Sequence, residues 1–148
     1  MIITFCGHSS FVETEEYKNK TLKILISITK DTPVEFYLGG YGGFDEFAYF
    51  CCNEYKKINK NVTLNFITPY ITLDYQKNHL SHLTHKYDNI IYPEIENIPL
   101  RYAITYRNKW MIDKADVIIS FIKHNFGGAY KTFCYAKKKN KMIFNIFY

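Results

Sequence analysis

The chain has 148 residues, of which 47% are hydrophobic and 22% charged, with a formal net charge of +5 at pH 7. This length and hydrophobic share suit one domain with its own core, so we expect residues 1–148 to form a single domain. No apolar run approaches the length that spans a bilayer, and no basic leader precedes one, so we expect a cytoplasmic protein with no membrane contact.

Apolar runs in the first half predict short buried strands that alternate with helices. Residues 2–6 and 34–38 are rich in β-branched and aromatic side chains, which is typical of buried parallel strands. An amphipathic pattern between them predicts a helix from Thr14 to about Asp31. A second helical pattern covers residues 44–55, and a third strand is predicted over residues 62–68. Strand, turn and helix therefore follow one another along this half.

The second half resumes this alternation after an interruption. Residues 69–100 lose periodicity, so we predict a long loop excursion of the kind that often covers a site. Helical character follows over residues 101–114, then an apolar strand over 117–122, a helix over 132–139 and a last strand over 142–146. Such repeats imply parallel pairing with right-handed crossovers. The sequence therefore predicts an α/β, Rossmann-like three-layer fold with a mainly parallel sheet of about five strands.

Two diglycine turns each follow a predicted strand and precede a predicted helix. The first contains Gly39, Gly40, Gly42 and Gly43, and the second contains Gly127 and Gly128. Glycine lets a backbone approach a phosphate closely, and the N–H groups of the following helix favour an anion. Because parallel strands end at one edge of the sheet, we expect both turns to face one crevice, together with Gly7. Neither turn is a full dinucleotide fingerprint or a P-loop. A tight turn is the alternative explanation of the glycines, but the four glycines of the first turn exceed what a tight turn requires, which favours the approach of a ligand.

Charged and polar residues beside the turns are further candidates. The forked guanidinium of Arg107 suits a phosphate, and an ion pair with Asp113 or Asp116 is the alternative. Asp45 is placed to accept hydrogen bonds from ribose hydroxyls, or else to cap its helix. The Thr132 hydroxyl either donates to a phosphate or bonds its own helix.

Several rings are also expected near the crevice. One of them could stack on a base, although most aromatic residues at helical spacing belong to a core. The histidines that follow predicted strands are candidates for loops that touch a ligand. These residues are His8, Tyr41, Phe44, Tyr106, Trp110 and His124.

The remaining clusters argue against a metal and against nucleic acid. His79, His82 and His85 are spaced three apart but have no accompanying carboxylate motif, so we predict no metal site. The four cysteines lack metal-ligand spacing and predict buried free thiols. The dense lysine run at residues 137–141 lies at a predicted helix end without interleaved aromatic residues, so nucleic acid is not an expected partner.

One stretch of the chain resembles a known superfamily. Residues 107–119 read Arg-Asn-Lys-Trp-Met-Ile-Asp-Lys-Ala-Asp-Val-Ile-Ile, followed by Gly127-Gly128-Ala129 and by residues 135–139. An Arg-Asn-x-x-Met helix, an Ala-Asp strand start and a Gly-Gly turn in this order resemble the YpsA-like branch of the SLOG superfamily, which also joins the Smf/DprA and Lonely Guy proteins. The resemblance implies a Rossmann-like sheet that binds a nucleotide or a nucleotide-derived small molecule. Asn108 either contacts that ligand or holds the neighbouring loop.

The same resemblance leaves catalysis open. In the Lonely Guy pattern an arginine works with a glutamate of the second glycine turn, and Arg107 matches the arginine. Cys134 stands in the place of the glutamate, and Tyr130 in the place of a further glycine. Glu46 has the glutamate's register in the first turn, but the order of the elements assigns the catalytic turn elsewhere. Enzyme activity is therefore uncertain from the sequence.

We expect a protein that binds a nucleotide-derived small molecule at the two turns, as a sensor or ligand carrier without a cofactor. One alternative is an N-glycosidic hydrolase or transferase acting on nucleoside monophosphates, with Glu46, Asp45 and Arg107 as its catalytic candidates. Another is a single-stranded DNA binder, and a homo-oligomer is a further expectation. The candidate ligand-binding residues are Gly7, His8, Gly39, Gly40, Gly42, Gly43, Asp45, Arg107, Asn108, Gly127, Gly128, Ala129 and Thr132.

Overall fold

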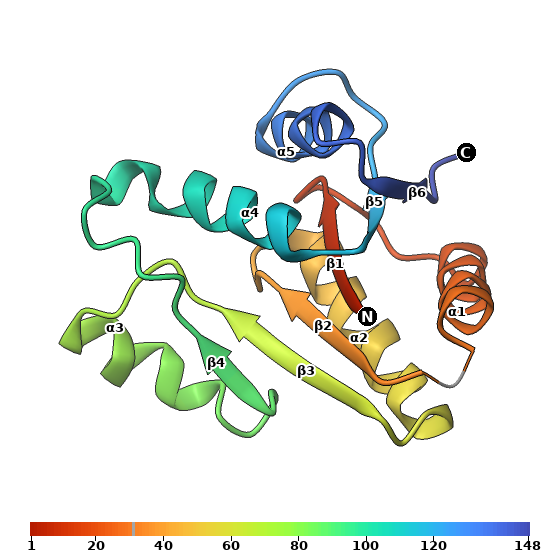
Figure 1. Ribbon diagram of the computed structural model, residues 1–148, viewed down its shortest axis with the longest axis horizontal. Coiled ribbons are helices and arrows are strands. Elements are labelled where there is room, and N and C mark those ends of the chain that lie inside the picture. Colours follow the sequence, from red (N-terminus) through yellow and green to blue (C-terminus); the bar gives the residue numbers. More distant parts are fainter. Residues whose placement is uncertain (31) are drawn as a thin grey trace.

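The computed structural model describes residues 1–30 and 32–148 and contains one parallel sheet (Figure 1). Its strands are β1 (Ile2–Gly7), β2 (Val34–Leu38), β3 (Val62–Ile67), β4 (Asn89–Ile91), β5 (Val117–Phe121) and β6 (Met142–Asn145). They lie in the order β4-β3-β2-β1-β5-β6, and every neighbouring pair is parallel. The predicted α/β, Rossmann-like class is confirmed, with a sheet of six strands rather than about five.

Helices cover both faces of the sheet and complete three layers (Figure 1). They are α1 (Glu15–Thr29), α2 (Gly42–Ile58), α3 (Leu73–Asn78), α4 (Ala103–Lys114) and α5 (Gly128–Lys138), with single 3₁₀ turns at Leu80–His82 and Leu100–Tyr102. Helices α1 and α2 pack on one face of the central strands, and α4 and α5 pack side by side on the other. Side chains alternate across a strand, so Phe5 faces the first pair of helices and Cys6 the second.

The starts of the helices follow from their first residues. Thr14 precedes α1, and its hydroxyl accepts a hydrogen bond from the Tyr17 N–H at 3.2 Å, as its place in the sequence predicts. The predicted end of this helix at Asp31 lies outside the described residues. Helices α2 and α5 begin at Gly42 and Gly128, earlier than predicted. Their glycine-containing first turns have no apolar periodicity that the sequence could reveal.

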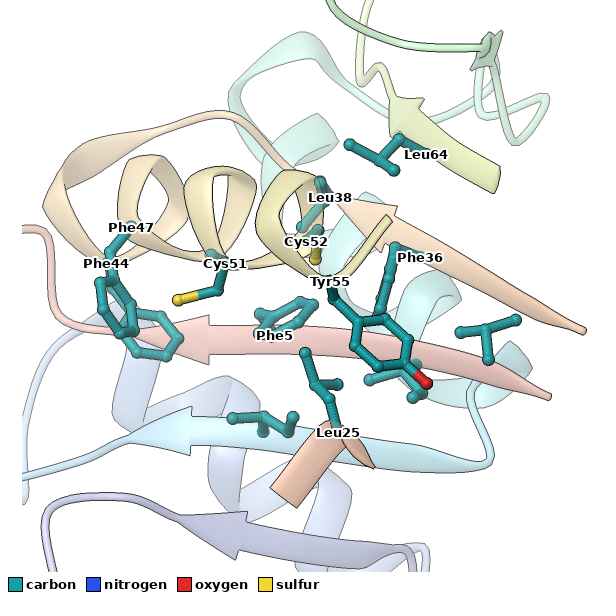
Figure 2. Packing of buried hydrophobic residues seen from close by; sticks show 14 of the residues in the cluster. Phe5, Leu25, Phe36, Leu38, Phe44, Phe47, Cys51, Cys52, Tyr55 and Leu64 are labelled. Carbon is teal, nitrogen blue, oxygen red and sulfur yellow. The ribbon is translucent and has the colours of Figure 1, made fainter. Parts of the chain in front are cut away.

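An aromatic and thiol-bearing face of α2 forms the main core against the sheet (Figure 2). Its members are Phe44, Phe47, Cys51, Cys52 and Tyr55, which pack near Phe5 and Phe36. Burial raises the pKa of the Cys51 thiol to about 12, so this thiol stays protonated and unreactive. Cys134 is exposed, which corrects the expectation that all the thiols are buried.

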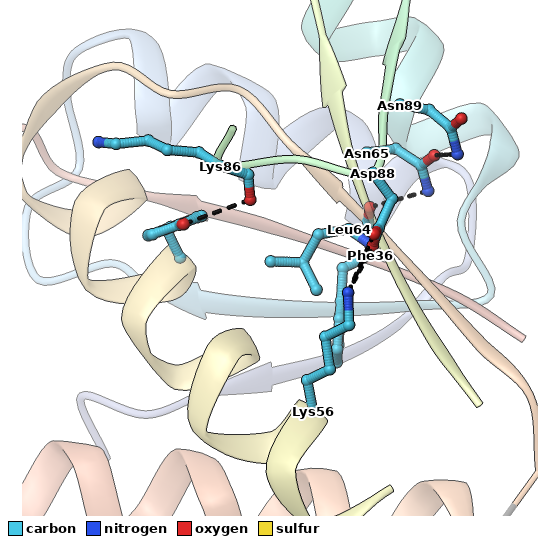
Figure 3. A network of polar contacts seen from close by, with 8 residues as sticks. Phe36, Lys56, Leu64, Asn65, Lys86, Asp88 and Asn89 are labelled. Carbon is cyan, nitrogen blue, oxygen red and sulfur yellow. Dashed lines mark hydrogen bonds and ion pairs between the residues drawn. The ribbon is translucent and has the colours of Figure 1, made fainter. Parts of the chain in front are cut away.

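The segment between β3 and α4, expected as a loop excursion, contributes a short helix and the edge strand β4. Asp88 directly precedes this strand, and one of its carboxylate oxygens accepts hydrogen bonds from Leu64 N–H and Lys56 Nζ, both at 2.8 Å (Figure 3). Asn89 Nδ2 donates to Asn65 Oδ1 at 3.0 Å. Polar side chains therefore hold this strand in place, and its length of three residues is too short to produce a hydrophobic period.

Candidate functional site

A cavity of about 420 Å³ opens at the carboxyl ends of β1 and β5. These two strands are neighbours although the chain forms β2, β3 and β4 between them, so the order of the strands reverses at this point. Open α/β sheets bind their ligands in the crevice beyond such a reversal. The loops after β1 and β5 and the helices α2, α4 and α5 supply the walls of the cavity.

Nine of the thirteen candidate ligand-binding residues line this cavity. They are Gly7, His8, Asp45, Arg107, Asn108, Gly127, Gly128, Ala129 and Thr132. The glycines of the first turn do not line it. Three of them lie instead at a second cavity of about 420 Å³, which also contains Glu46. The structure thus gathers the second glycine turn and its polar neighbours, and binding of a ligand by these residues stays a prediction.

The first glycine turn packs against the loop that follows β1. A Cβ on Gly42 would lie 2.8 Å from Ser9 Cα, and one on Gly43 would lie 2.6 Å from the Phe11 carbonyl oxygen. Gly42 also has a φ of 85°, which side chains rarely adopt. The Gly43 N–H donates to the Ser9 carbonyl oxygen at 2.9 Å. We expected free amides from both turns to face one ligand, and this expectation is corrected for Gly43, whose amide is used within the protein.

The second glycine turn is open. Among the described residues, no neighbouring atom lies within 4 Å of a Cβ built on Gly127 or Gly128. Gly127 has a φ of 91°, so the backbone requires glycine there. Within the described part of the chain, α5 begins without a side-chain cap. The first N–H groups of a helix have no intrahelical partner, so those of α5 are available to an anion in the cavity.

Arg107 acts as an internal strut beneath the cavity. Its side chain is only 2% exposed, and Nη1 donates to the carbonyl oxygens of Gly39 at 3.1 Å and Ile67 at 2.6 Å. Its Nε donates to Asn108 Oδ1 at 2.9 Å. One guanidinium therefore joins α4 to the chain at the carboxyl ends of β2 and β3. Asn108 accepts from this guanidinium and does not itself bond that part of the chain.

The two carboxylates considered as partners of Arg107 bond elsewhere. Asp113 accepts from the Tyr135 hydroxyl, and Asp116 accepts from the Ile2 N–H, each at 2.8 Å. Both residues therefore hold neighbouring elements together and do not order the Arg107 side chain.

Asp45 satisfies the backbone at the start of α2. Its Oδ2 accepts from the Tyr41 N–H at 2.9 Å. Burial raises the pKa of this carboxyl to about 6, although the Tyr41 N–H and the Arg107 charge both act to lower it. Thr132 likewise bonds its own helix, since its hydroxyl donates to the Gly128 carbonyl oxygen at 3.1 Å. The local alternative considered for Thr132 is therefore present, whereas Asp45 lies in the first turn of α2 and bonds the N–H of the N-cap residue Tyr41 instead of capping the helix itself.

His8 organises the loop after β5. Its Nε2 accepts hydrogen bonds from the N–H groups of Lys123 and His124, both at 3.0 Å. An acceptor at Nε2 requires a neutral imidazole that carries its proton on Nδ1. Burial, together with the neighbouring His124, lowers the pKa of His8 and favours this neutral form. A role as an acceptor for a distant loop is one that the sequence did not suggest.

We expect His8 to make the fold sensitive to mild acid. Because its pKa is lower in the folded than in the unfolded chain, the unfolded chain takes up the proton first as the pH falls below about 6.5. The free energy of unfolding should therefore fall more between about pH 7.5 and about pH 5.5 in the wild type than in His8→Gln, whose amide oxygen accepts without titrating. Asp45 has a raised pKa and acts in the opposite direction, but it is present in both proteins. Equal pH slopes in urea melts would contradict this role of His8.

Three neighbouring rings, those of His8, His124 and Phe126, extend from the cavity wall to solvent. The ring centroids of His8 and His124 lie 4.9 Å apart, and those of His124 and Phe126 lie 5.1 Å apart with an angle of 21° between the planes. Phe126 lines the cavity and is 67% exposed. Sequence analysis missed this ring, although a large apolar residue in a polar loop directly before a glycine turn was a signal. Of the aromatic residues that it named, Tyr41 also lines the cavity, whereas Phe44 is core.

No group of three metal-ligating side chains gathers anywhere in residues 1–30 and 32–148. The ring of His79 instead stacks on Tyr75, with centroids 4.8 Å apart. In the same ranges, none of the helices combines the length and the apolar character that crossing a membrane requires.

Known structures share this fold. The first is DNA processing protein A from Helicobacter pylori, described for its single-stranded DNA binding mode, with a TM-score of 0.63 and 18% identity over 98% of this chain and 64% of that chain. The second is DNA processing protein A (DprA) from Streptococcus pneumoniae, with a TM-score of 0.60 and 12% identity over 97% of this chain and 49% of that chain. No family model matches this chain, and no curated protein matches it. The chain thus spans less than two thirds of either relative, and at these identities the likeness establishes the fold.

This likeness overturns our expectation about partners. We expected a nucleotide-derived small molecule and no nucleic acid, yet a protein that shares the fold over nearly all of this chain binds single-stranded DNA. The expectation was based on the lysine run at residues 137–141 taken as a line of sequence. It did not consider what the folded chain places beside those lysines.

Proposed function

We propose that this chain is a member of the SLOG superfamily and binds single-stranded DNA at the cavity beside α5. The observation that carries the proposal is the uncapped N-terminus of α5, with two open glycines and the exposed Phe126 ring directly before it. The likeness of the fold to a single-stranded DNA-binding protein supports the same conclusion. The YpsA-like branch and any activity of the longer relatives stay predictions.

A single strand offers two groups that fit this arrangement. A phosphate accepts hydrogen bonds from the N–H groups of Gly128 and Ala129, and the positive end of the α5 dipole favours its charge. A base stacks on Phe126, which the histidine rings beneath it support. Every base has a flat face, so this mode of binding tolerates any sequence. Arg107 contributes mainly by holding the cavity wall, because its Nη1 already donates to two carbonyl oxygens.

We do not propose cleavage of a glycosidic bond. Glu46 is exposed and lines the second cavity, not the main one. Cys134, which stands in the place of the catalytic glutamate, is exposed on α5. Among the described residues, Asp45 is the one carboxylate that lines the main cavity, and it already bonds the Tyr41 N–H.

Replacing Phe126 tests the proposal. Phe126→Ala should weaken binding of a fluorescent thymidine oligomer by about 1–3 kcal/mol, which corresponds to roughly 5-fold to 150-fold, because a base loses its stacking surface. Phe126→Tyr keeps a flat ring and should bind nearly as the wild type does. The thermal midpoint should stay the same in both variants, since the ring is exposed. Fluorescence anisotropy at one fixed low salt concentration measures the affinity.

Absence of oligomer binding by the wild-type protein under these conditions would overturn the proposed function. Equal affinity of the wild type and Phe126→Ala would leave DNA binding in place but remove Phe126 from the site.

A further inference from the structure

The outer surface of α4 and α5 carries a row of alternating rings and ammonium groups. Lys109 Nζ lies 5.5 Å from the ring centroids of both Tyr106 and Tyr135, and Lys139 Nζ lies 5.4 Å from the Tyr135 ring. We call these four residues the α4–α5 row. Tyr106 is 44% exposed, and both lysines are exposed. The row therefore presents an accessible ring and two cations to solvent.

One ring of the row is fixed in place. The Tyr135 hydroxyl donates to Asp113 Oδ1 at 2.8 Å, which joins α5 to α4. Lys109 and Lys139 lie near the same ring, where its quadrupole attracts them. A ring and two cations held in this way lose little freedom when they bind a partner.

Helices α4 and α5 carry an excess of positive charge. Within α4 and α5, Asp113 is the single acidic residue, and it already accepts from Tyr135. The lysines of the same two helices are Lys109, Lys114, Lys131, Lys137 and Lys138. Such an excess favours a polyanion, and rings between the cations suit a polyanion with exposed bases.

The row continues from the cavity. Asn108 and Thr132 line the cavity, Lys109 is the next residue after Asn108, and Tyr135 follows Thr132 by about one helical turn. Helices α4 and α5 pack against each other (Figure 1). Tyr135 and Lys139 lie toward the C-terminal end of α5, so the row leads away from the α5 N-terminus. A chain that leaves the cavity in this direction meets the row directly.

We propose that the α4–α5 row is a second contact surface for the same single-stranded DNA, which takes nucleotides beyond those held in the cavity. This inference rests on the proposed function. Lysines 137–139 appeared to lack interleaved aromatic residues along the sequence, but in the helix Lys137 Nζ lies 5.5 Å from the Phe133 ring and Lys139 lies over the Tyr135 ring. Residues four apart share a helix face, so the folded chain supplies the interleaving.

The test compares a short strand with a long one. The double variant Tyr106→Ala/Lys109→Ala should bind a thymidine oligomer of about 16 nucleotides roughly tenfold more weakly than the wild type, yet bind one of about 4 nucleotides equally well. Loss of one phosphate contact should also reduce the slope of log affinity against log salt by about 0.7. Lys23→Ala, at an exposed residue of α1 across the sheet, is the matched charge control and should leave both affinities unchanged.

The outcomes separate this inference from the proposed function. If the wild type and the double variant bind the longer oligomer equally, with the same salt slope, the row is not a contact surface and the cavity proposal stands. If the affinity of the double variant falls equally for both oligomers, the row is part of the primary site, which contradicts a second surface. If the wild type binds neither oligomer, both proposals are overturned.

Discussion

Arg107→Met is expected to lower the free energy of unfolding by about 3–5 kcal/mol, the cost of removing one partner from a buried charged network. The carbonyl oxygens of Gly39 and Ile67 would each lose a charged donor in a buried site. Asp45 would lose the positive charge that opposes its burial, so its pKa should rise further above about 6. Methionine keeps much of the unbranched length, so the loss would report polar contacts more than packing.

Two further variants make this measurement specific. Arg107→Lys keeps the charge but lacks the forked guanidinium that reaches the carbonyl oxygens and Asn108 together. Its free energy of unfolding should therefore lie between those of the wild type and Arg107→Met. Arg101→Met removes an exposed arginine that lies over the Tyr102 ring, and it should change stability by less than about 0.5 kcal/mol. Urea unfolding followed by circular dichroism measures all three. A loss below about 1 kcal/mol in Arg107→Met would mean that Arg107 is not a strut and is free to serve a ligand.

Elements with a clear hydrophobic pattern could be predicted from the sequence. Strand β2 has the predicted bounds because its side chains are apolar and buried except for the exposed Glu35, and this run ends at the first glycine turn. The cap at Thr14 was predicted because it depends on residues adjacent in the chain. Strand β4 was missed, since Asp88 and Asn89 place it through polar bonds to residues 24 positions earlier.

The location of the candidate site could be predicted from the sequence, but most of its side-chain contacts could not. Parallel strands and their reversal were enough to locate a crevice after β1 and β5. The two carbonyl partners of Arg107, however, are 40 and 68 residues away, and His8 bonds amides 115 and 116 residues away. Residue type alone gives each side chain a range of partners, and only the packed chain selects among them.

The sequence predicted a similar role for the two glycine turns, and a matched pair of substitutions should separate them. Gly43→Ala is expected to lower the free energy of unfolding by about 3 kcal/mol. The added Cβ would lie 2.6 Å from the backbone oxygen of Phe11 and 2.8 Å from that of Ser9. A backbone oxygen cannot relieve a close contact by changing rotamer as a side chain can, so α2 would have to move away from the loop after β1. Thermal unfolding should show a clearly lower midpoint.

Gly128→Ala should give the opposite result. Open space surrounds this position, and alanine favours a helix by up to about 1 kcal/mol over glycine, so stability should be unchanged or slightly higher. The added methyl group would occupy the space through which a phosphate approaches the α5 amides, so oligomer affinity should fall by about 1–2 kcal/mol. The same melts and anisotropy titrations on both variants give the comparison. A stable Gly43→Ala would contradict the packing role of the first turn. Unchanged affinity in a folded Gly128→Ala would mean that the strand does not approach the start of α5, because nothing else at that position opposes a methyl group.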